Sequence, residues 1–140
     1  MSWKKYRLIG LDSNIFSYQF HKHPIFGPIA KEIFDALSLN ELHAVTSIIT
    51  LIEVLSVKAP LIKLKQLEKQ FSETPNLTVF DVNHEIALEA AKIRRKYGFR
   101  LPDSIQLATV IHAKAKVFIT NDSRLKSLKK LKIVLLSEIP

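Results

Sequence analysis

Short apolar runs that alternate with helix-like segments constrain the fold of this chain most strongly. The runs contain few polar residues and lie at 7–11, 43–46, 77–82, 116–120 and 133–136. Uninterrupted apolar runs of this length are typical of strands that are covered on both faces. Segments with helical periodicity lie between them, at 28–39, 48–57, 60–71 and 83–97. This alternation predicts right-handed crossovers and a mainly parallel central sheet in a three-layer α/β/α fold.

Length and composition favour a single domain. The chain has 140 residues, of which 47% are hydrophobic, and folding at this size hides roughly 70% of the unfolded surface. The sequence has no cysteine, which excludes disulfides, zinc–thiolate sites and thiol nucleophiles. A metal ion would therefore be held by oxygen or imidazole ligands.

Four acidic residues occupy element boundaries. Asp12 and Asp122 each follow a strand-like run, Asp103 follows Pro102 at the start of a helix, and Glu53 lies in the segment 48–57. Sites in parallel sheets form at the carboxyl ends of the strands, so we expect these acids to converge at one edge. Clustered carboxylates favour a hard cation such as Mg²⁺ or Mn²⁺. The pattern predicts metal-dependent chemistry on phosphates.

Each acid also has an ordinary structural interpretation. Asp12 can cap the helix that follows it, and Asp122 can cap the turn after the fourth strand. Glu53 and Asp103 both fit capping-box spacings, with Thr50 and Gln106 respectively. Taken singly, each acid favours the structural role, and only the set of four favours a metal site.

Glu53 gives a further argument for a cation. Its sequence neighbours are apolar, and no lysine or arginine lies within one helical turn of it. We therefore expect a buried carboxylate, which needs a compensating positive charge. A divalent ion would supply that charge and would relieve repulsion among the acids.

Several other enzyme classes lose support. The sequence has no G-x-x-x-x-G-K-[ST], G-x-G-x-x-G or G-x-S-x-G motif, which disfavours phosphate-loop, dinucleotide and α/β-hydrolase sites. Asn14 stands where an aspartyl-phosphate phosphatase would carry its second aspartate. The five histidines show no H-x-x-x-H spacing, so zinc is disfavoured.

The chain is strongly basic and has no obvious membrane segment. It carries 21 basic and 13 acidic residues, a net charge of +8, which favours the capture of polyanions. The alternative is that the protein is merely basic and its surface binds no polyanion. No signal peptide or transmembrane stretch is recognisable, so we expect a cytoplasmic protein with no membrane partner.

Taken in order, these motifs resemble those of a PIN domain, and most closely the VapC-like toxin ribonucleases. The family opens with a strand and Asp-Thr/Ser-Asn, which matches Asp12-Ser13-Asn14. Its helical glutamate matches Glu53. Its Pro-Asp-x-x-x-x-Ala motif matches the segment 102–108, and its Thr-x-Asp motif matches Thr120-Asn121-Asp122. The resemblance covers nearly the whole chain and implies a single PIN-like domain over residues 1–140.

The resemblance implies a metal-dependent endoribonuclease that hydrolyses RNA phosphodiesters, as the toxin of a toxin–antitoxin pair. Asp12, Glu53 and Asp103 would bind the principal Mg²⁺ or Mn²⁺, and Asp122 would help with a second ion or a water. Neighbouring polar side chains would position these ligands or the phosphate: Ser13, Asn14, Thr120 and Asn121. Three basic residues near the acids in sequence would contact RNA, or would be ordinary surface charges: Arg100, Lys116 and Arg124.

Other functions stay open. One is a non-catalytic RNA-binding or protein-interaction module with the same fold, and another is a DNA nuclease, because phosphate chemistry does not select the sugar. Segments 48–57 and 60–71 are apolar enough to form a homodimer face or to belong to the core.

Overall fold

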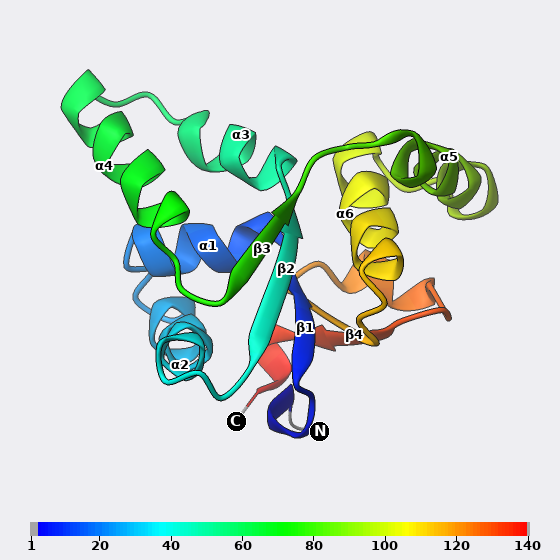
Figure 1. The fold of residues 1–140 in the computed structure, drawn as a ribbon, viewed down its shortest axis with the longest axis horizontal. Coiled ribbons are helices and arrows are strands. Elements are labelled where there is room, and N and C mark those ends of the chain that lie inside the picture. Colours follow the sequence, from blue (N-terminus) through cyan, green and yellow to red (C-terminus); the bar gives the residue numbers. More distant parts are fainter. Residues whose placement is uncertain (1–2, 140) are drawn as a thin grey trace.

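The computed structural model describes residues 3–139, and a five-stranded sheet forms its central layer (Figure 1). The strands are β1 (Leu8–Leu11), β2 (His43–Ser47), β3 (Leu77–Phe80), β4 (Val117–Thr120) and β5 (Lys132–Leu135). Their order is β3-β2-β1-β4-β5, and every neighbouring pair is parallel. The expectation of a mainly parallel sheet is confirmed.

Helices cover both faces of the sheet, which confirms the three-layer α/β/α fold. The α-helices are α1 (Ser13–Phe20), α2 (Phe26–Ser38), α3 (Ile49–Leu55), α4 (Leu61–Ser72), α5 (His84–Tyr97) and α6 (Leu101–His112). Figure 1 shows α1, α2 and α4 on one side of the sheet and α5 and α6 on the other. Three short 3₁₀ helices complete the described chain: η1 (Trp3–Lys5), η2 (Ser123–Ser127) and η3 (Leu136–Glu138). No helix within residues 3–139 is long and apolar enough to cross a membrane.

The strands divide their side chains between two hydrophobic clusters. Ile119 on β4 packs in the cluster beneath α1 and α2, whereas its neighbour Phe118 packs in the cluster beneath α5 and α6. Successive strand residues point to opposite faces, so a fully buried strand must be apolar throughout. This requirement explains why the strands read as continuous apolar runs.

Gly10 allows α6 to lie close against the middle of the sheet. A Cβ atom at this position would meet Val110 Cγ2 at 2.4 Å and Cγ1 at 2.7 Å. The missing side chain of Gly10 therefore sets the distance between β1 and α6, the helix that carries Asp103 near its start.

The strand order places a topological switch between β1 and β4. From β1 the chain proceeds to β2 and β3 on one side, and it returns through α5 and α6 to β4 on the other. Ligand sites in such sheets form outside the carboxyl ends of the strands at this switch. Asp12 follows β1 and Asp122 follows the end of β4, so both acids lie at this point.

Candidate active site

Asp12 is the buried acid of the site. It caps α1, with Oδ1 accepting a hydrogen bond of 2.8 Å from the Ser13 backbone N–H, and Oδ2 accepts one of 2.7 Å from the Thr120 hydroxyl. The residue is only 5% exposed. Burial raises the pKa of Asp12 to about 6; the Thr120 and Ser13 hydrogen bonds lower it, and the nearby Asp103 and Glu53 carboxylates raise it. Asp12 therefore combines an N-cap role with a position among like charges.

Thr120 orders the polar groups around Asp12. Its hydroxyl donates to Asp12 and accepts from the backbone N–H of Asp122 at 3.1 Å and from the Asn14 side-chain amide at 3.4 Å. Because the only hydroxyl proton of Thr120 goes to Asp12, Asn14 presents its NH₂ group to Thr120. Asn14 Oδ1 is then buried without a hydrogen-bond partner among residues 3–139. A buried carbonyl oxygen without a hydrogen-bond partner is chemically a suitable ligand for a hard cation or its water.

Glu53 reaches the site from a more open position than the sequence suggested. Its Oε2 accepts a hydrogen bond of 2.9 Å from the Ser13 hydroxyl, which connects it to the Asp12 turn. However, Glu53 is exposed, and its neighbour Ile52 is 61% exposed. The expectation of a buried Glu53 was wrong because one face of α3 is open to solvent, so its apolar sequence neighbours do not enclose it.

A buried polar network connects α3 and α6 beneath the acids. Gln106 Nε2 donates to the Thr50 hydroxyl at 2.7 Å, and its Oε1 accepts from the Ser47 backbone N–H at 3.2 Å. Thr46 and Thr50 share a further hydrogen bond of 2.7 Å. The capping-box interpretations of Thr50 and Gln106 were therefore wrong, since both side chains point into the protein. The sequence signal for this network was the presence of polar residues, Gln106 among them, in a largely apolar helical segment.

Arginines neutralise the two outer acids. Asp103 is buried near the start of α6, and its Oδ2 lies 3.1 Å from Arg100 Nε and 4.0 Å from Arg124 Nη2. Asp122 caps η2 and accepts a hydrogen bond of 2.9 Å from Arg124 Nε. Hydrogen bonding from Arg124 lowers the pKa of Asp122, although partial burial opposes this effect. Arg124 thus joins Asp122 to Asp103.

The remaining predicted residues lie elsewhere. Asn121 is directed away from the acids: its amide donates to the Tyr18 hydroxyl at 3.1 Å and accepts from the Ser137 backbone N–H at 3.1 Å. It therefore ties α1 to η3. Lys116 precedes β4, and so lies at the opposite edge of the sheet from Asp122. Lys116 is near the acids in sequence, but the full length of β4 separates it from Asp122 in the structure.

The oxygen-rich set fits a hard cation in its chemistry, although a complete ligand shell is not assembled. Within residues 3–139, no three His, Asp or Glu side chains form a group that could hold one metal ion. The reasons are local: Arg100 and Arg124 engage Asp103, while Glu53 stands in solvent. The observations that favour a cation are the burial of Asp12 beside neutral hydrogen-bond donors and the unpartnered Asn14 oxygen.

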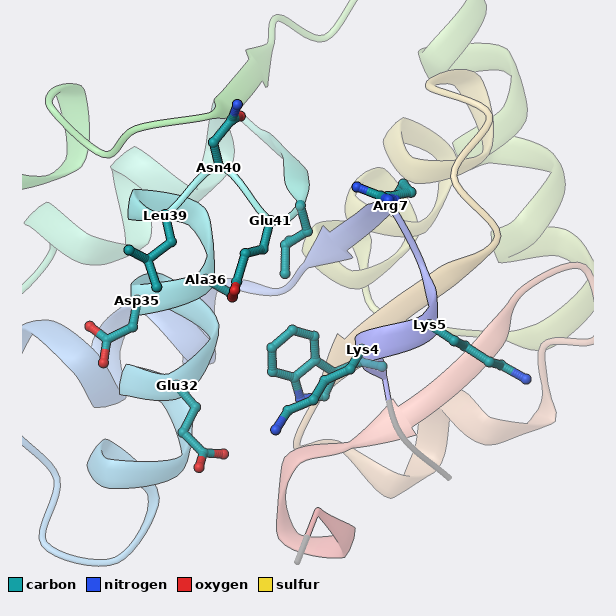
Figure 2. Close-up of a pocket in the computed structure, with 11 residues that line it drawn as sticks. Lys4, Lys5, Arg7, Glu32, Asp35, Ala36, Leu39, Asn40 and Glu41 are labelled. Carbon is teal, nitrogen blue, oxygen red and sulfur yellow. The ribbon is translucent and has the colours of Figure 1, made fainter.

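A separate pocket lies at the other end of the molecule. It is lined by Lys4, Lys5 and Arg7 of the N-terminal segment and by Glu32 and Asp35 of α2, and Figure 2 shows Lys5 pointing away from the two acids. None of the four acids lines it. The pocket lies at the amino-terminal edge of β1 and is therefore distinct from the acid site.

Comparison with known proteins yields one family and a set of similar folds. The PIN domain family model matches residues 9–131. A chain in the structure of VapBC2 from Rickettsia felis bound to a promoter DNA fragment is 18% identical, with a TM-score of 0.73 over 91% of this chain and 98% of that one. A chain of a toxin–antitoxin complex from Klebsiella pneumoniae is 23% identical, with a TM-score of 0.70 over 94% and 99%.

A third similar structure is FitAcB from Neisseria gonorrhoeae, at 17% identity and a TM-score of 0.68 over 94% of this chain and 99% of that one. No curated relative matches the sequence. At these identities the solved structures establish the fold.

Proposed function

Because the chain belongs to the PIN-domain family, we propose that it is a metal-dependent endoribonuclease that hydrolyses RNA phosphodiesters. The observation that carries this proposal is the polar cluster at the carboxyl edge of the sheet, where Ser13 bonds to both Asp12 and Glu53, at 2.8 Å and 2.9 Å, and the charges of Glu53 and Asp103 add to the effect of burial on the pKa of Asp12. Such a set is stable at neutral pH when a cation offsets the repulsion. The basic character of the chain, +8 overall, favours a polyanionic substrate.

Each residue would have a defined part in the reaction. Asp12, Asp103 and Glu53 would hold Mg²⁺ or Mn²⁺, with Asp122 assisting at the outer side. A bound divalent ion supplies Lewis-acid activation of water and stabilises charge on the phosphate. Ser13 and Thr120 keep the carboxylates of Glu53 and Asp12 oriented through their hydroxyl groups, and the amide of Asn14 provides a further oxygen.

Two arginines near the acids are suited to bind the phosphates of an RNA substrate. Arg100 and Arg124 are exposed and lie beside the acids, where a guanidinium group can bind a phosphate in a bidentate manner. We therefore retain both as RNA contacts in the proposal. Asn121 and Lys116 have no place in it, because Asn121 bonds to Tyr18 and Ser137 and Lys116 lies at the opposite edge of the sheet from Asp122.

We test catalysis by incubating a mixed pool of structured RNAs with the wild type and with Asp103→Asn, in Mn²⁺, in Mg²⁺ and in EDTA. We expect cuts that require the metal and that are lost in the variant. Asp81→Asn is the matched control, because Asp81 is exposed and lies after β3. Cleavage that survives Asp103→Asn would contradict the assignment. Metal-independent RNA binding without cleavage by the wild type would instead favour a non-catalytic module.

We also propose that the protein is the toxin of a toxin–antitoxin pair. The support is the similarity of its fold to chains in structures described as toxin–antitoxin complexes or as VapBC. Induced expression in a bacterial host should stop growth, and Asp103→Asn should relieve the effect. Growth arrest by both proteins alike would contradict a toxicity that depends on cleavage.

A homodimer is part of the proposal as well. The two segments that we considered as a dimer face contain both buried and exposed apolar side chains. Leu67 and Phe71 belong to the core. In contrast, Ile52, Leu61 and Ile62 are 61–71% exposed. We expect these exposed side chains on α3 and α4 to contact a second copy. Light scattering should give twice the chain mass for the wild type and a monomer for Ile62→Lys; a monomeric wild type would contradict the proposal.

A further inference from the structure

Positive charge is distributed unevenly over the four acids. The outer pair has arginine partners: Asp103 contacts Arg100 Nε at 3.1 Å, and Asp122 contacts Arg124 Nε at 2.9 Å. Among the described residues, the inner Asp12 accepts only from the neutral donors Ser13 and Thr120. Within residues 3–139 no lysine or arginine forms a salt bridge with Asp12 or Glu53.

Asp103 connects the outer acids, which have arginine partners, with the inner Asp12. It is one of the acids that raise the pKa of Asp12, and its Oδ2 is also the oxygen that faces both guanidinium groups, at 3.1 Å and 4.0 Å. A carboxylate oxygen that serves two arginines is partly screened from a third cation. Any cation shared by Asp12 and Asp103 must therefore compete with these arginines.

Both arginines can leave Asp103 without disturbing the core. The side chains of Arg100 and Arg124 are 66% and 61% exposed, whereas that of Asp103 is 10% exposed. Ion pairs with such open partners contribute little to stability, typically about 0–1 kcal/mol. Their release costs little, and the freed fork-shaped groups match the geometry of a phosphate.

From this geometry we propose that Arg100, which is hydrogen-bonded to Asp103, and Arg124, which lies 4.0 Å from Asp103 and is bonded to Asp122, are resident counter-ions that compete with the divalent cation for these acids and thereby set the cation affinity of the site. Cation binding displaces the guanidinium group from Asp103 and makes it available to the RNA backbone. The proposal rests on the proposed function, since it concerns the same acids. Arg124 is a positioning residue here, because it acts through Asp103 and Asp122.

The test is a titration with Mn²⁺ alone, without RNA, in which electron paramagnetic resonance measures the free ion. We compare the wild type, Arg124→Gln, Arg124→Lys and Lys126→Gln. Lys126 is the matched control, because it lies on the same η2 helix, pairs with Glu138 and removes the same charge when it is replaced. Circular dichroism and urea unfolding establish that each variant is folded.

We expect Arg124→Gln to bind Mn²⁺ about tenfold more tightly, as the loss of a unit charge some 4 Å from the ligand implies. Lys126→Gln should change the affinity much less. Arg124→Lys should be intermediate, because it retains the charge but loses the planar fork. In cleavage assays Arg124→Gln should reach half-maximal rate at lower Mn²⁺ and show a higher KM for RNA.

Two results would overturn the inference, and they differ from failure of the proposed function. Equal Mn²⁺ affinity for the wild type and Arg124→Gln, with binding abolished by Asp12→Asn, would leave the metal site standing and refute the competition. Equal tightening by Arg124→Gln and Lys126→Gln would reduce the effect to overall charge. If neither the wild type nor Arg124→Gln binds Mn²⁺, the metal site itself fails, and the competition with it.

Discussion

Two acids of the site have opposite electrostatic surroundings. Burial raises the pKa of Asp12 to about 6, whereas the hydrogen bonds from Arg124 hold the pKa of Asp122 below its ordinary value. The two pKa values differ because Asp12 is buried and bonded to neutral donors, whereas Asp122 is partly buried and bonded to a guanidinium group. Ionisation of Asp12 therefore lowers the free energy of unfolding when no cation is bound.

The first prediction concerns Asp12 and pH. Because its folded pKa of about 6 exceeds the ordinary aspartate pKa of 3.8, the folded state gains stability as the pH falls from above 6 towards 4, and loses it as the pH rises again. The shift corresponds to about 3 kcal/mol. In EDTA, Asp12→Asn should raise the free energy of unfolding at pH 7.5, and the gain should shrink by pH 4.5.

Urea unfolding of the wild type and the variant at both pH values provides the measurement. Asp35→Asn is the control, because Asp35 is exposed and pairs with Lys31 on α2. A gain in stability that is independent of pH would show that Asp12 is not the titrating group.

The second prediction concerns the hydroxyl of Thr120. Thr120→Val keeps the shape of the side chain but removes the 2.7 Å hydrogen bond to Asp12 Oδ2, leaving a buried carboxylate oxygen unsatisfied. We expect a loss of about 1–3 kcal/mol in unfolding free energy at pH 7.5. Thr120→Ser should retain most of the stability. Equal unfolding midpoints for Thr120→Val and the wild type would refute the role of this hydroxyl.

At the scale of single residues, the sequence predicted local capping roles better than it predicted burial and interaction partners. Asp12 and Asp122 cap helices as expected, because capping depends on local backbone geometry. The burial of Glu53 was predicted wrongly, because it depends on which face of α3 meets the rest of the protein. The pairing of Arg124 with both outer acids joins two segments of the chain, so spacing alone did not predict it.

Among the elements, the contact between β1 and α6 determines where Asp103 lies. Gly10 permits this contact, since any Cβ there would lie 2.4 Å from Val110 Cγ2. Helix α6 also bonds to β2 through Gln106. Close packing at Val110 and the hydrogen bond at Gln106, in the middle of the helix, hold α6 in a single position against the sheet.

The third prediction follows from this packing. Gly10→Ala should lower the free energy of unfolding by about 1–3 kcal/mol, because the added methyl group overpacks the interface. Val110→Ala on the Gly10→Ala background should recover part of the loss by returning space. Urea denaturation of the two single variants and the double variant measures the coupling. Strict additivity of the two substitutions would contradict a direct clash.

Element boundaries were predicted from the sequence to within a few residues. The strand expected at 77–82 ends at Phe80, and the helix expected at 28–39 begins at Phe26. These ends depend on tertiary contacts that periodicity does not encode. The stop of α5 before Gly98 was predicted well, because Gly98 adopts a φ of 71° that other residues disfavour.

On the scale of the whole molecule, a basic chain surrounds a small acidic site. The net charge of +8 attracts a polyanion, while the acids repel its phosphates unless a cation intervenes. The parallel topology brings Asp12 and Asp122 to one edge, as the order of motifs predicted. Topology was predictable because alternating strands and helices leave few alternatives.

The fourth prediction concerns this charge. In EDTA, where metal-dependent cleavage is suppressed, RNA affinity should fall steeply between about 50 mM and 200 mM salt as counterions compete for the phosphates. Filter binding of a labelled RNA measures the slope, and Arg100→Gln should make it shallower by about one unit. Undiminished retention of RNA at high salt would contradict a contact that is driven mainly by phosphates.

Anomalous diffraction from crystals grown with Mn²⁺ would locate the ion relative to the four acids. We expect a peak between the carboxylates of Asp12 and Asp103, and no peak there in crystals of Asp12→Asn. We also expect Arg124 to have moved away from Asp103. A peak that persists in Asp12→Asn, or Mn²⁺ bound only elsewhere at concentrations that support cleavage, would contradict the proposed metal site.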